Sequence, residues 1–352
     1  MQKTIVDGVA LWSRRQPERN IFFNSYFIAE PNGNLIVDPL ALEADDANEI
    51  ELAGGAAWIV ITNRDHERDA RNVAERFGAK IAASEPDAKE MAVQIDRVLH
   101  DGDTIGSAEV VALDGLKTAG EFALYFPSKG AVLVGDAVLG DPAGSLRMMP
   151  DEKLGDPVRA ARSLRALRRM RPRHLLVGDG TSVFDRAYEA LTDLLESRTD
   201  AHTNLVNIEQ LNYTKTKGPG RFQDEWAEVG FLLGAERLGY AVTRLEPGIA
   251  CCPLHWHIGE EELFIVWDGT PTLESPHGEM PLRRGDFVCL PTRPFGAHRL
   301  VNNGPTPATV ILIANTNPLD ACFYPDSKKV LVEATGTLVR SEPILDYFDG
   351  EA

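Results

Sequence analysis

Two histidines, a run of three glutamates and a further histidine lie close together in the last third of the sequence: His255, His257, Glu260, Glu261, Glu262 and His298. Residues two apart in a β-strand face the same side, so His255 and His257 can point together into one interior. A carboxylate from the next strand and an imidazole from a later one would complete a set of three nitrogen ligands and one oxygen ligand. Such a set suits divalent iron, manganese, nickel, zinc or copper and leaves room for water or a substrate.

The glycines and prolines around these residues extend the pattern, which resembles the cupin superfamily. The first motif of that family appears as Gly248, His255, His257, Glu262 and Gly269, and the second as Gly285, Pro291, Gly296, His298 and Asn302. The resemblance covers about residues 225–325 and implies an all-β jelly-roll barrel. Two intervals depart from the family pattern, because the loop before His255 is one residue longer and the turn before His298 is extended.

The resemblance also implies that His255, His257, Glu262 and His298 hold one divalent transition metal, which would be Fe, Mn, Zn or Ni. Six residues separate Glu262 from Gly269, as the family pattern requires, so Glu262 is expected as the ligand in preference to Glu261. The alternative is a purely structural cluster of histidines without a metal.

The strands that carry the ligands indicate which side chains line a substrate pocket. Phe264 and Val266 follow Glu262 by two and four residues, so they share its face in an extended strand. Phe287 and Cys289 alternate in the same way on a later strand. We expect these four side chains to line the pocket, with ordinary core packing as the alternative.

The elements around these motifs differ between the two halves of the chain. In the first half, short β-rich runs at 26–28, 35–37, 58–61, 110–113, 122–126, 131–134 and 174–177 alternate with helical patterns at 70–77, 158–170 and 187–197. This alternation predicts an α/β domain. After residue 242, short strands separated by Gly, Pro and Asn turns predict an all-β domain. The expected domains are therefore residues 1–199 and 200–352.

The first domain resembles the metallo-β-lactamase superfamily over about residues 20–185. An opening hairpin at 24–39, the Gly135-Asp136 element and the stretch 174–180 follow the order of that family. The resemblance implies an αββα sandwich, which makes the whole chain an α+β protein of two domains.

The zinc ligands of that superfamily are replaced in this sequence. The positions of its HxHxDH motif hold Asn63, Asp65, Glu67 and Arg68. Two later histidine ligands are replaced by Lys117 and Asp179. Of the family's ligands only Asp136 remains. A dizinc site needs imidazoles, so no metal is expected in this domain. Asp65, Asp136 and Asp179 are expected to pair with Arg68 and Lys117.

The alternative for this domain is an oxygen-ligand metal site that uses Asp65, His66, Asp69 or Asp136. Taken alone, His66 is expected on the surface at the start of a helix.

Composition excludes several classes of partner. The 352 residues carry 36 basic and 53 acidic side chains, a formal charge of −17. Such acidity disfavours nucleic acid and anionic membranes. The four cysteines form no CxxC motif, and no apolar run reaches the length of a membrane span. These features favour reduced, mostly buried thiols and a cytoplasmic protein.

The sequence therefore predicts a metal-dependent cupin protein that acts on a small polar metabolite by dioxygenase-type or isomerase-type chemistry. In this prediction the lactamase-like domain is not catalytic. A metal-containing module that binds a sugar or acid without turnover is the alternative, and hydrolase activity in the first half is a weaker third. The cupin resemblance implies a homodimer.

Overall fold

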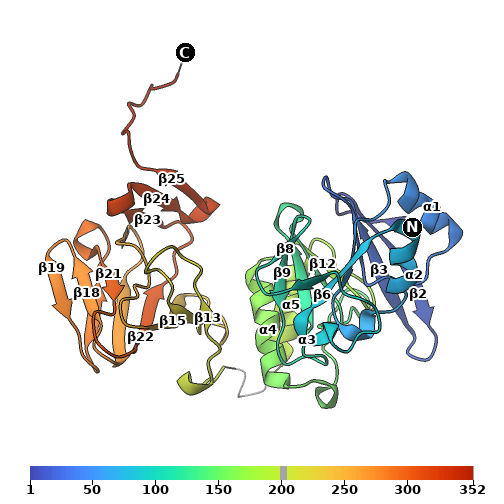
Figure 1. Ribbon diagram of the computed structural model, residues 1–352, viewed down its shortest axis with the longest axis horizontal. Helices are drawn as coiled ribbons and strands as arrows, with labels where there is room; N and C mark the ends of the chain where they lie inside the picture. Colours follow the sequence, from blue (N-terminus) through green and yellow to red (C-terminus); the bar gives the residue numbers. More distant parts are fainter. Residues whose placement is uncertain (199–203, 352) are drawn as a thin grey trace. The chain divides into compact units, whose positions relative to one another are not determined.

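The computed structural model describes residues 1–198 and 204–351 (Figure 1). The chain divides into two compact units, Met1–Thr203 and Asn204–Ala352. The domain boundary expected from the sequence, between residues 199 and 200, lies outside the described residues. Within the described part of the chain, no helix is long and apolar enough to cross a bilayer.

The first unit is built from two sheets and the helices that pack on them. A seven-stranded sheet has the order β1-β2-β3-β4-β5-β6-β7, and a five-stranded sheet has the order β12-β11-β10-β9-β8. The strands are β1 (Gln2–Lys3), β2 (Val9–Gln16), β3 (Ile21–Ile28), β4 (Leu35–Val37), β5 (Trp58–Ile61), β6 (Lys80–Ser84), β7 (Arg97–Leu99), β8 (Thr104–Ile105), β9 (Ala108–Ala112), β10 (Phe122–Phe126), β11 (Ala131–Val134) and β12 (His174–Val177). The helices are α1 (Ala44–Leu52), α2 (Ala70–Phe77), α3 (Glu85–Ala88), α4 (Pro157–Arg169) and α5 (Ala187–Ser197).

Separate apolar cores cover the two faces of each sheet in this unit. One core joins the two sheets through side chains such as Tyr26 and Phe122. A second joins the five-stranded sheet to α4 and α5 through Leu164 and Leu191. The third joins the seven-stranded sheet to α1 and α2. Burial on both faces explains why these strands read as continuous apolar runs in the sequence.

Parallel pairing brings four loops of the first unit to the ends of neighbouring strands. β4 pairs in parallel with β5, and β11 pairs in parallel with β12. Asp38 follows β4, His66 lies in the short turn after β5, Asp136 follows β11, and Asp179 follows β12. The residues directly after parallel strands leave the sheet at the same end, so the topology gathers these four polar side chains.

The second unit is an all-β arrangement in its described residues, 204–351. Its sheets have the orders β13-β14-β15-β22-β17-β20, β16-β23-β24-β25 and β19-β18-β21. The strands are β13 (Thr214–Lys215), β14 (Glu225–Glu228), β15 (Leu238–Leu245), β16 (Trp256–His257), β17 (Glu262–Asp268), β18 (Thr272–Ser275), β19 (Gly278–Pro281), β20 (Phe287–Leu290), β21 (Arg299–Val301), β22 (Ala308–Asn315), β23 (Ala321–Tyr324), β24 (Lys329–Val332) and β25 (Thr337–Arg340). One core, which includes Phe264, Leu273 and Leu300, joins the six-stranded and three-stranded sheets.

Candidate metal centre

The four residues expected as metal ligands come together in the second unit. His255 and His298 face each other across an isolated antiparallel bridge, His257 ends β16, and Glu262 begins β17. Glu262 Oε2 lies 3.2 Å from His298 Nε2 and 3.8 Å from the Nε2 atoms of both His255 and His257. Glu261, the other glutamate considered, is exposed. The carboxylate of Glu262 and three ring nitrogens therefore face one point.

Each histidine of the centre has its second ring nitrogen occupied. The Nδ1 atoms lie 3.0 Å from the Pro253 carbonyl oxygen for His255, 2.6 Å from Asp320 Oδ2 for His257, and 2.9 Å from the Gly296 carbonyl oxygen for His298. A carbonyl oxygen can only accept, so Nδ1 carries the proton in His255 and His298. The Nε2 lone pairs then face the centre, which is the arrangement that outer hydrogen bonds impose on metal-binding histidines.

One buried atom of this centre lacks a partner. His298 is 1% exposed, and its Nε2 atom has no hydrogen-bond partner in the structure. Leaving a buried acceptor unpaired costs about 1–3 kcal/mol, so a partner for this nitrogen would stabilise the site. A divalent cation satisfies His298 Nε2 and balances the carboxylate of Glu262. The residues present therefore fit a transition-metal ion.

The ionisation of two of the three histidines, His255 and His298, agrees with this donor set. Burial, with the nearby charges of His298 and His257, lowers the pKa of His255 to about 3. Burial and the charge of His257 lower the pKa of His298 to about 4. Both imidazoles are therefore neutral near pH 7, as metal ligation requires. Burial also lowers the pKa of His257, but Cys322, Glu262 and Asp320 outweigh it and raise the value to about 10.

The pocket residues expected from the sequence divide into two pairs. Phe264 and Val266 are buried, and the Phe264 ring meets His298 edge to face at 5.2 Å between centroids. Phe287 is 70% exposed and Cys289 is exposed. The expectation that these two point inward is wrong.

Strand register explains the error. β17 pairs with β20 so that Glu262 lies opposite Leu290 and Phe264 lies opposite Val288. Cross-strand partners share a face, so Val288 and Leu290 are the inward residues of β20. The sequence shows the period of two but does not fix which residues of β20 face inward.

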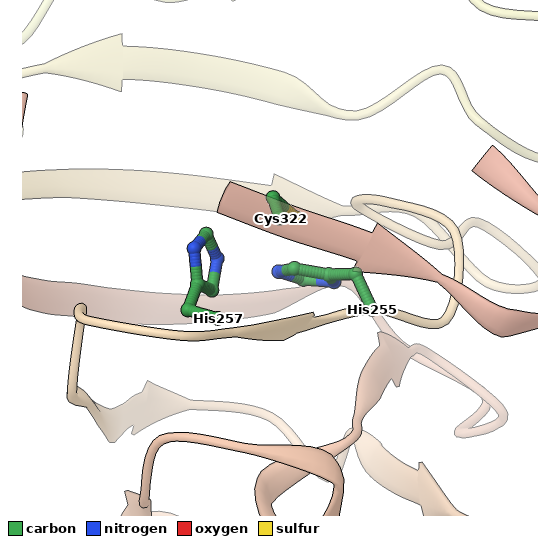
Figure 2. A group of neighbouring side chains, drawn as sticks. All are labelled: His255, His257 and Cys322. Atoms are coloured by element: carbon green, nitrogen blue, oxygen red, sulfur yellow. The ribbon is translucent and has the colours of Figure 1, made fainter. Parts of the chain in front are cut away.

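Sequence reasoning missed the contribution of β23. Asp320, just before this strand, is the acceptor for His257 Nδ1, and Cys322 lies close to His255 and His257 (Figure 2). The Tyr324 ring stacks on His255 with 6.0 Å between centroids and 26° between planes. The HxH pattern gives no sign of Asp320 or Cys322, because long-range pairing of β16 with β23 brings them to the site.

The first unit holds a second cluster of polar side chains, centred on His66. This histidine is 3% exposed, so the expectation of a surface position is wrong. Its Nδ1 lies 2.8 Å from Asp38 Oδ2, and its Nε2 lies 3.4 Å from Asp136 Oδ1. The turn between β5 and α2 directs the ring inward, toward the ends of β4 and β11.

The expected ion pairs of this cluster are present. Arg68 Nη2 lies 3.2 Å from Asp179 Oδ1 and 3.1 Å from His66 Nε2. Lys117 pairs with Asp65 and lies 4.0 Å from Asp136 Oδ2. Two side-chain cations therefore lie within the set of acids.

The protein thus has two units with different sites. The all-β unit holds three histidines and one glutamate, and the α/β unit holds a charged cluster at its strand ends. The family model of the metallo-β-lactamase superfamily matches residues 4–198, more than half of the chain, and the chain belongs to that superfamily. The model of the cupin domain matches residues 241–314. The protein is thus a fusion of a metallo-β-lactamase-like domain with a cupin domain.

Solved structures resemble each half of the chain. A sugar phosphate isomerase of the cupin superfamily from Silicibacter pomeroyi is 24% identical, with 41% of this chain and 97% of that chain covered and a TM-score of 0.36. A metallo-β-lactamase from Pontibacter korlensis is 15% identical, with 56% of this chain and 98% of that chain covered and a TM-score of 0.46. No curated protein matches the sequence.

The zinc ions that the superfamily implies do not fit the residues of the first unit. His66, Asp136 and Asp179 offer ligand atoms within 4.8 Å of one another, but Arg68 Nη2 lies against two of these three groups. Burial and Arg68 lower the pKa of His66, yet Asp38 and Asp136 outweigh them and raise it to about 10. Like charges at such distances repel strongly, so the guanidinium and imidazolium stand where an ion would be.

Proposed function

We propose that the second unit binds one divalent transition-metal ion through His255, His257, Glu262 and His298. The observation that carries the proposal is the convergence of three Nε2 atoms on Glu262 Oε2 at 3.2–3.8 Å. The occupied Nδ1 atoms support the same assignment, because they leave Nε2 as the free donor.

The proposed activity is metal-dependent conversion of a small polar metabolite, of the dioxygenase or isomerase type. A bound Fe, Mn, Zn or Ni ion acts as a Lewis acid on a substrate oxygen. Within the chain, Asp320 orients His257 and the Phe264 ring shields His298 from water. The catalytic part is then residues 200–352, folded as a jelly-roll barrel. Residues 1–199, an αββα sandwich, serve as a non-catalytic domain of a cytoplasmic homodimer.

Elemental analysis of protein purified without a histidine tag tests the metal assignment. The wild type is expected to hold about one transition-metal ion per chain, and His255→Ala combined with His298→Ala is expected to hold none. His277→Ala is the matched control, because His277 is exposed on the turn between β18 and β19. Undiminished metal in the double variant would refute the assignment.

A binding module without turnover is the second candidate, and the burial of the centre favours it. The side chains of the four proposed ligands are 1–17% exposed, so access to the ion is narrow. Azide titrated into the cobalt-loaded protein separates the candidates. A changed visible spectrum indicates an open coordination position and favours an enzyme, whereas an unchanged spectrum favours the binding module.

A further inference from the structure

Cys322 lies beside the proposed metal centre on a strand that the cupin model does not cover. The model matches residues 241–314, and Cys322 belongs to β23, Ala321–Tyr324. β23 pairs antiparallel with β16 so that Cys322 lies directly opposite His257. Side chains opposite each other on neighbouring strands share a face, so the thiol and the imidazole point to the same side of this sheet.

The thiol is within reach of an ion held by the histidines. One ligand atom each from His255, His257 and Cys322 lies within 4.8 Å of the other two (Figure 2). Zinc binds sulfur at about 2.3 Å and imidazole nitrogen at about 2.0–2.1 Å, so donors of one ion can be about 4 Å apart. The separations in this group are therefore close to those of donors that share one ion. His255 belongs both to this group and to the group that it forms with Glu262 and His298.

The surroundings of Cys322 differ from those of a cysteine that only fills space. It is 2% exposed, and its sulfur lies beside two imidazoles, those of His255 and His257. A structural buried cysteine is usually packed as a small apolar residue. A buried thiol beside two imidazoles that are proposed to hold an ion is instead placed where it can act as a ligand. In the same centre, the buried Nε2 of His298 has no hydrogen-bond partner among the described residues and is available to an ion.

We propose that the Cys322 thiolate is a further ligand of the ion in the cupin domain. This inference rests on the proposed function, because it concerns the same ion. On binding, the S–H bond breaks, the proton passes to solvent, and a metal–sulfur bond forms with no change of oxidation state. A soft sulfur donor added to imidazoles favours Zn(II), Co(II), Ni(II) or Cu(I) over Mg(II) and Mn(II).

Two other cysteines provide matched controls. Cys252 Sγ lies 3.6 Å from His255 Nδ1, the ring nitrogen that the Pro253 carbonyl oxygen already accepts from, so this thiol is near the centre but on the wrong side of the ring. Cys289 is exposed on the outer face of β20. A signal that depends on Cys322 and not on these two identifies the ligand.

Cobalt substitution tests the proposal in the full chain. Wild type, Cys322→Ser, Cys252→Ser and Cys289→Ser are loaded with Co(II), and cobalt content and the near-ultraviolet absorption are measured together. A thiolate ligand produces a thiolate-to-cobalt charge-transfer band. We expect the band in wild type and in both control variants, and its loss in Cys322→Ser.

The outcomes separate this proposal from the proposed function. Cobalt bound to wild type without the band overturns Cys322 as a ligand but leaves the four-residue centre intact, and this result does not depend on the folding of any variant. A band that persists in Cys322→Ser also overturns the assignment. Wild-type protein that binds no cobalt overturns both the centre and its sulfur ligand.

Discussion

Arg68 gives the first unit a cation of its own where its superfamily implies a metal. Its guanidinium contacts His66 and Asp179, and the backbone at this residue has a φ of 42°. This value lies in the left-handed region, which glycine adopts more readily than arginine. The arginine is therefore held in an unfavourable conformation while it balances the buried acids.

Removal of this guanidinium is predicted to create a metal site. Arg68→Gly relieves the backbone and removes the guanidinium, so an incoming ion has to displace only the proton of His66 to reach His66, Asp136 and Asp179, whose ligand atoms lie within 4.8 Å of one another. In a background of His255→Ala and His298→Ala, the variant is expected to gain about one divalent ion per chain, measured by elemental analysis. Arg64→Ala, which removes a partner of Glu90, is the control and should gain none. Absence of metal in Arg68→Gly would show that the cluster closes without the guanidinium.

His66 is predicted to make stability fall as the pH rises. Burial and Arg68 lower its pKa, but Asp38 and Asp136 raise it from 6.5 to about 10. Because the folded-state pKa is the higher one, the charged imidazole stabilises the fold fully below about pH 6.5 and loses this effect as the pH passes through about 10.

Thermal unfolding of wild type and His66→Gln between pH 6.5 and 10 measures this contribution. The difference in unfolding temperature between the two proteins should shrink as the pH rises. A difference for His66→Gln that does not change with pH would contradict the assigned charge.

At the scale of elements, much of the fold is predictable from local patterns. The helices expected at 70–77 and 187–197 match α2 and α5, and the strand expected at 58–61 matches β5. Periodicity and β-branched runs are local properties, so they are visible in the sequence. The HxH pattern likewise predicted that His255 and His257 lie together, and both imidazoles lie beside Glu262 in the structure.

What the sequence did not predict depends on pairing between distant segments. Asp320 and Cys322 join the centre because β23 aligns with β16, about 65 residues earlier in the chain. The inward face of β20 depends on its register with β17, which decides between Phe287 and Val288. The burial of His66 depends on the parallel strands that bring Asp38 and Asp136 against it.

The contact between β16 and β23 is predicted to support metal binding from the face of the sheet opposite the ligands. The rings of Trp256 and Phe323 stack at 4.2 Å with 7° between planes, which fixes the strand that carries His257 against the strand that carries Cys322. An aromatic pair contributes about 0.5–1.5 kcal/mol beyond its buried area. Phe323→Ala should therefore weaken metal affinity several-fold.

A competitive titration with a chromophoric chelator measures that affinity. Tyr347→Ala is the control, because this ring is 89% exposed in the C-terminal segment. Equal affinities for Phe323→Ala and wild type would show that β16 keeps its position without the stacked pair.

At the scale of the whole molecule, the two compact units have separate cores and balance the charge of their buried carboxylates in different ways. The first balances buried acids with Arg68, Lys117 and His66. The second presents the neutral imidazoles of His255 and His298, together with Glu262, to an ion from solution. The stability of the first unit should therefore not depend on metal, whereas that of the second should.

Calorimetry with and without a chelator tests this difference. An ion present at 1,000 times its dissociation constant stabilises the unit that binds it by about 4 kcal/mol. Chelation should lower one unfolding transition and leave the other in place, and the His255→Ala, His298→Ala variant should show the chelated pattern without chelator. A shift of both transitions would mean that the first unit also depends on metal.

The bridge between His255 and His298 has a further consequence. Each residue donates its backbone N–H to the carbonyl oxygen of the other, at 3.0 and 2.9 Å. These reciprocal bonds restrict the backbone at two ligands before an ion arrives, so little conformational entropy remains to be lost on binding. The apo protein is preorganised at this pair, and metal uptake should be rapid and should proceed without a folding step.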